Sequence, residues 1–193
     1  MRETHNRLAG KSSTVKSPKS APSRFGLTAP VESAVPPRVE STRYPSLGEA
    51  LDHFQLRARF LQKIRLHLEK MRDLAAFNAE NKVDEDRCQG YYHHACTVKQ
   101  IAATCYNGAP LFDRGNIVAD AGDRENHLIM EGLDLTHPAI AAATESSIAS
   151  KEQAAQARDT LHRALRYVTV VEAVLESNLS RLSFMNRHLE LVA

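Results

Sequence analysis

The sequence predicts a mainly α protein in which three long antiparallel helices form a coiled-coil-like bundle. A short β-hairpin is expected between the second and third helices, and a disordered tail before the first. Two observations support this fold class. Apolar residues recur every three or four positions along three stretches, which is the periodicity of amphipathic helices. The 193 residues include no Trp and few Phe or Tyr, so the core must consist mostly of the aliphatic side chains that fill helix–helix contacts.

Residues 1–44 differ in composition from the rest of the chain. They contain five of the eight prolines and many Ser and Thr, with only scattered apolar residues. Such a segment buries too little apolar area to offset the entropy lost on ordering, so we predict a disordered tail. Eight basic and three acidic residues give it a net charge of +5. We interpret it as a solubilising or targeting arm; an arm that binds nucleic acid or lipid is the alternative.

The first helix is expected to begin after Ser46, a plausible N-cap with Glu49 three residues later. An apolar stripe at helical spacing then predicts a helix of about thirty residues. The stripe consists of Leu47, Leu51, Phe54, Ala58, Leu61, Ile64, Leu68, Met71 and Ala75. Charged residues between these positions, Arg57 among them, are expected to face solvent.

Two further stripes predict the second and third helices. Asp84 is a plausible N-cap for the second helix, and the third is expected from about Ser150 to the C-terminus because this stretch contains no Gly or Pro. The second stripe consists of Cys88, Tyr91, Ala95, Val98, Ala102 and Cys105. The third consists of Leu161, Leu165, Val168, Val171, Leu175, Leu179, Leu182 and Leu189. Together these helices define a predicted helical domain over residues 45–193.

Between the second and third stretches, two short β-prone runs predict a hairpin. They are Ile117–Ala119 and His127–Met130, separated by the polar sequence AGDREN. The hairpin region spans about residues 109–137. An isolated hairpin is unstable in water, so this one is expected to lie against the helices.

Five short motifs, taken in order, resemble the helical domain of bacterial flagellins. The first four are Met71-Arg72-Asp73-Leu74-Ala75, the acidic link Asp84 to Arg87, Ile101-Ala102-Ala103-Thr104 with Tyr106-Asn107-Gly108, and Leu111-Phe112-Asp113. The fifth, Tyr167–Ser183, has Val171, Leu175, Glu176 and Leu182 in register with a C-terminal flagellin helix. The resemblance covers about residues 47–115 and 150–190.

The residues singled out by this resemblance are motif and packing positions. They are Leu68, Arg72, Leu74, Ala75, Ile101, Thr104, Tyr106, Asn107, Gly108, Leu175, Glu176 and Leu182. We expect Leu61, Leu68, Leu74, Ile101, Leu175 and Leu182 in the interface between the helices. Asn107 and Gly108 are expected in a turn that requires positive φ. By the resemblance, that turn leads from the second helix into the hairpin.

The resemblance implies a structural protein of the bacterial flagellum. The expected role is a minor or non-standard component of the filament or a junction, exported through the flagellar apparatus. Its expected partners are other flagellin or flagellin-like subunits, or a flagellar secretion chaperone. The resemblance does not extend to the terminal helices that form the inner tube of filaments. The alternative is therefore a cytoplasmic helical interaction module, derived from flagellin, that binds flagellin or a secretion chaperone.

Several classes of function are not expected. No catalytic or cofactor motif occurs, so we expect neither an enzyme nor a bound cofactor. His93 and His94 lie near Cys88 and Cys96 in sequence, but His93 points to a different helical face from both cysteines, so we expect no metal site. We expect reduced thiols. The net charge of +2 predicts no nucleic-acid partner, and no apolar run is long enough to predict a membrane span.

Overall fold

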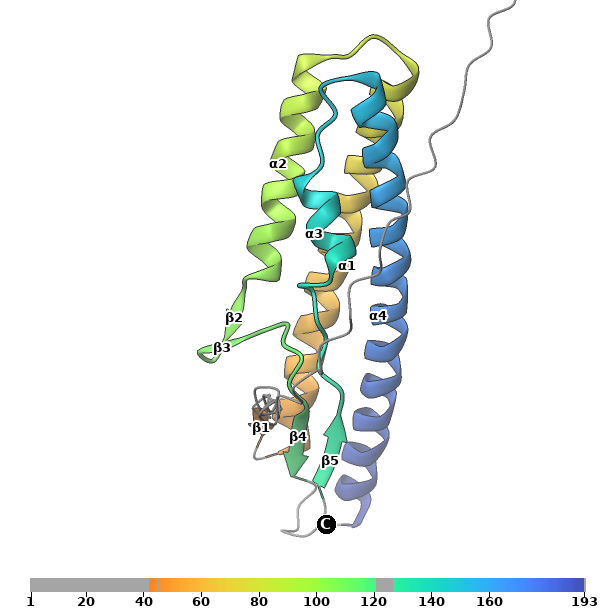
Figure 1. The fold of residues 1–193 in the computed structure, drawn as a ribbon. Helices are drawn as coiled ribbons and strands as arrows, with labels where there is room; N and C mark the ends of the chain where they lie inside the picture. The colour runs from red at the N-terminus through yellow and green to blue at the C-terminus, as the bar shows by residue number, and fades with distance from the viewer. Residues whose placement is uncertain (1–41, 45, 121–126, 193) are drawn as a thin grey trace, which may run out of the picture. The chain divides into compact units, whose positions relative to one another are not determined.

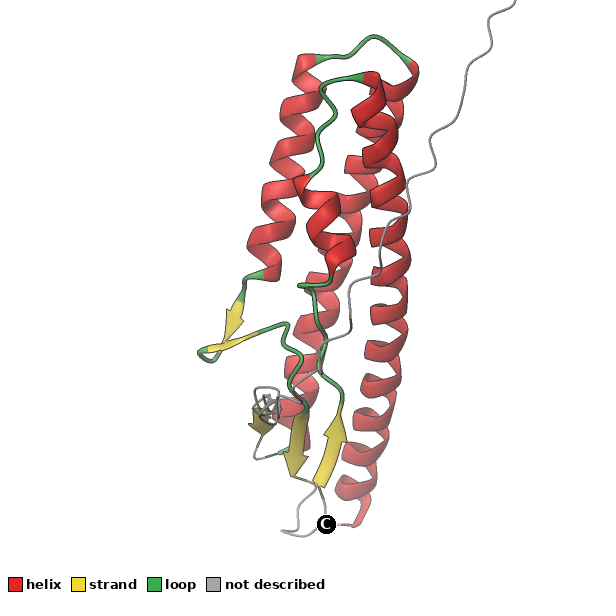
Figure 2. Ribbon diagram, in the orientation of Figure 1, coloured by secondary structure: helices red, strands yellow, loops and turns green. Residues whose placement is uncertain are grey.

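The computed structural model describes residues 42–44, 46–120 and 127–192, all within one compact unit that spans Pro37–Ala193. Most of the predicted tail and the AGDREN linker lie outside the described residues. The described part is mainly helical (Figures 1 and 2). Its helices are α1 (Leu47–Glu80), α2 (Glu85–Ala102), α3 (Pro138–Glu145) and α4 (Lys151–Val192). Its strands are β1 (Thr42–Tyr44), β2 (Cys105–Tyr106), β3 (Ala109–Pro110), β4 (Ile117–Asp120) and β5 (His127–Met130).

Side-chain caps fix the start of each long helix. Ser46 Oγ accepts a hydrogen bond from the backbone N–H of Glu49 at 3.2 Å, and an Asp84 carboxylate oxygen accepts one from the N–H of Asp86 at 2.9 Å. Ser150 Oγ accepts from the N–H of Gln153 at 3.2 Å, directly before α4. Each cap satisfies a backbone donor that has no partner within its helix.

Helices α1 and α4 run antiparallel and form the main packing interface (Figure 1). Two ion pairs between the helices show the antiparallel direction. A guanidinium nitrogen of Arg158, near the start of α4, lies 3.9 Å from a carboxylate oxygen of Glu80 at the end of α1. A guanidinium nitrogen of Arg65, nearer the middle of α1, lies 2.5 Å from a carboxylate oxygen of Glu172. Between the helices, the buried side chains from α1 are Leu61, Ile64, Leu68, Met71 and Ala75. Those from α4 are Ala154, Ala157, Leu161, Ala164, Val168, Val171, Leu175 and Leu182. The frequent alanines on α4 allow the two backbones to approach closely.

A fourth helix, α3, corrects the prediction of three helices. It is only eight residues long and lies between the β-region and α4. Pro138 occupies its first turn, and the ring of His137 caps it by accepting from the N–H of Ala139 at 3.1 Å. Its sequence, PAIAAATE, is too short to show a helical period, and His is not among the usual capping residues.

The β-region contains two hairpins and one parallel strand. Strands β2 and β3 pair on either side of Asn107 and Gly108, whose φ angles are 52° and 81°. Both residues lie in the left-handed region, as a two-residue turn of type I′ requires. The Asn-Gly turn thus closes its own small hairpin, and the hairpin of β4 and β5 is a separate one.

Strand β1 corrects the predicted boundary between tail and helical domain. Thr42–Tyr44 were expected in the disordered tail, but they pair in parallel with Ile117–Ala119 of β4. Tyr44 is buried, and its hydroxyl lies 2.6 Å from Nδ1 of His53 on α1. The pairing partner is more than seventy residues away in sequence, so no local pattern could indicate it.

The buried face of α1 also departs from the predicted stripe. In its first turns the buried positions include Ala50, His53 and Arg57, whereas Leu51 and Ala58 are half-buried. Arg57 was expected to face solvent but is only 2% exposed. Cys105, the last residue of the second predicted stripe, is exposed because α2 already ends at Ala102.

Candidate functional site

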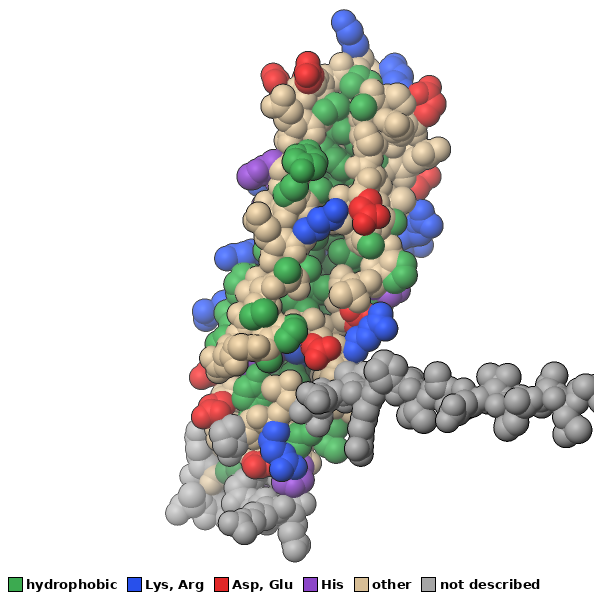
Figure 3. Space-filling view, turned by 60° about the vertical axis from the view of Figure 1, so that its left-hand side comes forward, with side chains coloured by type: hydrophobic (Ala, Val, Ile, Leu, Met, Phe, Trp, Pro, Cys, Tyr) green, Lys and Arg blue, Asp and Glu red, His purple; other side chains and the backbone are tan. Residues whose placement is uncertain are grey.

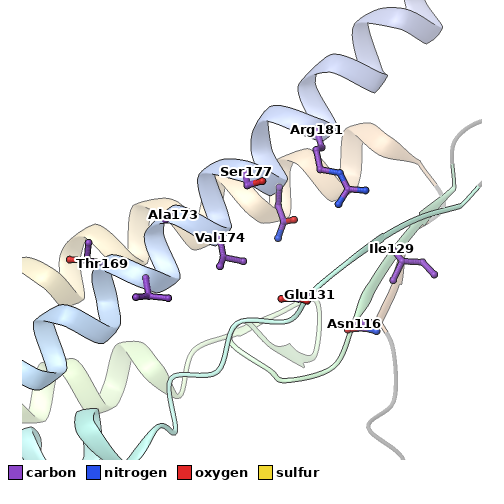
Figure 4. Close-up of a pocket in the computed structure, with 10 residues that line it drawn as sticks. Asn116, Ile129, Glu131, Thr169, Ala173, Val174, Ser177 and Arg181 are labelled. Atoms are coloured by element: carbon purple, nitrogen blue, oxygen red, sulfur yellow. The ribbon is translucent and has the colours of Figure 1, made fainter.

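An open groove of about 860 Å³ lies between α4 and the β4–β5 hairpin. Figure 4 shows Val174 and Arg181 projecting from α4 toward the side of the strands. Ile129 of β5 is 58% exposed and Val170 of α4 is 61% exposed. Two large apolar side chains thus remain accessible to solvent on opposite walls of one groove. A chain segment lying in the groove would contact both side chains.

One wall of the groove also contains a buried amide group without a hydrogen-bond partner among the described residues. Asn178 is only 6% exposed, yet its Nδ2 has no hydrogen-bond partner among the described residues. Leaving a buried amide donor unpaired costs about 1–3 kcal/mol. Glu131 on the strand side and Arg181 on α4 add one charge of each sign.

The edge of β5 borders the same groove. The strand order of the sheet is β1-β4-β5, so β5 pairs with β4 on one side and has no strand on the other among the described residues. Such an edge presents backbone N–H and C=O groups that can pair with an added strand. The arrangement suits an extended peptide segment with apolar side chains.

Gly132 and Asp134, just after β5, fix the position of the β4–β5 side of the groove, which we call the strand wall. A Cβ on Gly132 would collide with the carbonyl oxygens of Asp113 and Gly115, so only glycine permits this close approach of two backbone segments. The carboxylate of Asp134 forms an ion pair with Arg114 at 2.5 Å, and its carbonyl accepts from the hydroxyl of Tyr167 at 2.5 Å. The last contact ties the strand wall to α4.

A second polar cluster lies inside the domain, where β1 and the segment after β3 meet α1. Arg57 Nε donates to the carbonyl of Leu111 at 2.6 Å, but its Nη1 has no partner among the described residues, and burial lowers the pKa of Arg57 to about 10. Burial, with the charge of Arg57 as a smaller cause, lowers the pKa of His53 to about 4. Because His53 Nδ1 bonds to Tyr44, this cluster connects three chain segments.

The residues predicted from the resemblance occupy other places. Leu68, Ala75, Ile101, Leu175 and Leu182 are buried in the core, and Leu74, Thr104 and Tyr106 are half-buried. Asn107 and Gly108 form the exposed turn, Arg72 bonds to its neighbour Asp73, and Glu176 is exposed. None of these residues lines the groove. Sequence analysis missed the groove, although Val170 and Val174 gave a signal as apolar residues outside the predicted stripe.

Clusters of three or more metal ligands and membrane-spanning helices are absent from the described part of the chain. There, no three or more His, Cys, Asp or Glu side chains group as they would around a metal ion. Likewise, no described helix has both the length and the apolar character to cross a membrane. On the face shown in Figure 3, basic and acidic side chains are interspersed, with hydrophobic side chains between them.

Comparison with known proteins identifies the fold. No family model matches the chain, and no curated protein matches its sequence. The crystal structure of Bacillus cereus flagellin matches with a TM-score of 0.63 at 20% identity, covering 73% of this chain and 86% of that chain. The chain has a flagellin-like fold. At this identity the similarity concerns the fold alone.

Proposed function

We propose that this chain is a flagellin-like structural protein, associated with the bacterial flagellum as a minor or non-standard component of the filament or a junction. The flagellin-like fold, over 73% of the chain, is the observation that supports this role. The role is structural and involves no catalysis. Other flagellin or flagellin-like subunits are the proposed partners, and the flagellum outside the cell is the proposed location.

The groove between α4 and β5 is the proposed contact surface for such a subunit. We propose that it takes an extended segment of the neighbouring subunit as an additional strand on β5. The unpaired β5 edge supplies backbone hydrogen bonds, and Ile129 and Val170 supply apolar contacts.

The location is tested by mass spectrometry of filaments sheared from the source cells, compared with the lysate of the same cells. Peptides from the region Asp73–Lys82 enriched in the sheared fraction would support the flagellar role. Peptides confined to the lysate would refute it.

The contact surface is tested by introducing a charge into the groove. Val170→Asp should reduce co-sedimentation with filaments because an aspartate cannot be buried without a partner. Leu66→Asp is the matched control, since Leu66 is also an exposed apolar helix residue but lies on α1 outside the groove. Equal co-sedimentation of the folded Val170→Asp variant and wild type would refute the groove as the contact surface.

The second candidate is a cytoplasmic helical interaction module that binds flagellin or a flagellar secretion chaperone. The cysteines favour it: Cys88, Cys96 and Cys105 are all free, and Cys105 is exposed. Free thiols persist most readily in a reducing compartment. Pull-down with purified flagellin, and separately with a purified secretion chaperone, tests this role directly.

A further inference from the structure

Two histidines from different helices meet between α1 and α2. Nδ1 of His67 on α1 lies 3.0 Å from Nδ1 of His94 on α2, and the centroids of the rings are 5.1 Å apart. The residues are 27 positions apart in sequence, so only the packing of the two helices brings them together. Both side chains are half-buried.

We propose that His67 and His94 form a binding site for a divalent transition-metal ion of the nickel, copper and zinc group, joining α1 to α2. Imidazole nitrogen is a favoured ligand for these ions. With metal–nitrogen bonds of about 2.0–2.1 Å, two adjacent ligands stand roughly 2.9–3.4 Å apart, depending on the coordination geometry. The observed separation of 3.0 Å falls within this range without movement of either helix.

The protonation of the pair suits this role. Burial, with smaller effects from the charge of Lys70 and from His93, lowers the pKa of His67; burial, His67, Lys70 and His93 lower the pKa of His94. Both shifts favour the neutral imidazole, which is the form that binds a metal ion. Without metal, one Nδ1 carries the proton of the Nδ1–Nδ1 hydrogen bond. When metal binds, that proton moves to Nε2 of the same ring, so both Nδ1 lone pairs face the ion and no net proton is released.

The surroundings determine the rest of the coordination. No third His, Cys, Asp or Glu among the described residues completes the site, so water molecules occupy the remaining positions. His93 lies next to the pair, with its ring centroid 5.6 Å from that of His94. Lys70 is the nearby positive charge that opposes a cation, but its side chain is exposed and therefore screened by solvent.

Calorimetric titration with Ni²⁺ and Zn²⁺ tests the proposal, using the untagged full-length chain at neutral pH with a reductant. We expect one ion to bind per chain and to raise the melting temperature. Loss of an outer-sphere partner alone costs metal affinity about 10–100-fold, so removal of a direct ligand in His67→Gln or His94→Gln should weaken binding about tenfold or more. The exposed His162 on α4 provides the matched control His162→Gln, which should bind as wild type does.

Two further measurements keep the test decisive. Circular dichroism should show unchanged helix content in the His67→Gln and His94→Gln variants, since both positions are only half-buried. Cys96→Ser excludes a contribution from the thiol two residues beyond His94, and should bind as wild type does. Absence of binding to wild type would overturn the proposal, as would binding of equal strength to the folded His67→Gln and His94→Gln variants.

Discussion

Acidification should destabilise this domain through His53, which is buried beside Tyr44 and Arg57. The pKa of His53 is lowered from 6.5 to about 4, so the unfolded chain binds a proton at a pH where the folded chain does not. Stability contributed by the neutral ring is complete above pH 6.5, falls as the pH drops from 6.5 to about 4, and is fully lost below that. A difference of this size corresponds to about 3 kcal/mol.

The assay is urea unfolding followed by circular dichroism at several values from about pH 7 to about pH 4. His53→Gln removes the titrating ring while keeping an acceptor for the Tyr44 hydroxyl. The pKa values of His67 and His94 are also lowered, so these two histidines also make the fold less stable as the pH falls. The difference in pH dependence between wild type and His53→Gln therefore isolates His53. His162→Gln is the matched control at an exposed position. An acid-induced loss of stability in His53→Gln as large as in wild type would refute the reasoning.

Four further substitutions give specific expectations. Gly132→Ala should destabilise by several kcal/mol in denaturant unfolding, because its Cβ meets backbone atoms; Gly90→Ala, whose Cβ would lie 3.6 Å from Leu74 Cδ1, should stabilise α2 by about 0.5–1 kcal/mol. Leu175→Ala should cost about 2–5 kcal/mol in the same assay, because Leu175 is fully buried between α1 and α4. Arg57→Met should raise the pKa of His53, measured by NMR titration, because it removes a nearby positive charge.

An exposed leucine provides the control for the buried one. Leu66→Ala, at a half-exposed position on α1, should change stability far less than Leu175→Ala. Unchanged unfolding of Leu175→Ala would contradict the described α1–α4 interface. Normal stability of Gly132→Ala would contradict the close backbone approach at that position. An unchanged His53 titration in the folded Arg57→Met variant would show that the Arg57 charge does not act on the ring.

Features set by neighbouring residues were accessible from the sequence. The first two long helices start directly after the predicted caps Ser46 and Asp84, and the third starts at its predicted position near Ser150, because an N-cap acts on donors two or three residues away. Asn107 and Gly108 adopt positive φ angles, which Gly reaches freely because it has no Cβ and which Asn tolerates better than most residues. In each case the interaction is complete within a few residues of chain.

Features set by distant residues were not accessible. The burial of Arg57 depends on the carbonyl of Leu111, 54 residues away, which accepts its hydrogen bond. The proximity of His67 and His94 depends on how far α1 and α2 slide past one another, which the periodicity of either helix leaves open. The groove likewise depends on where the β4–β5 hairpin lies along α4. Its lining residues are six polar and four apolar side chains, so no single apolar stripe marks it.

The parallel pairing of β1 with β4 determines how this end of the domain responds to mechanical load. Chain that enters from the N-terminal side reaches β1 before α1, and Thr42–Tyr44 are held along their length by Ile117–Ala119. A pull along the strand axis loads these hydrogen bonds in shear, all at once, rather than opening them one after another. The buried ring of Tyr44, bonded to His53, must leave in the same step. Tension in the preceding chain would therefore reach the pairing of β1 with β4 before it reaches the first turn of α1.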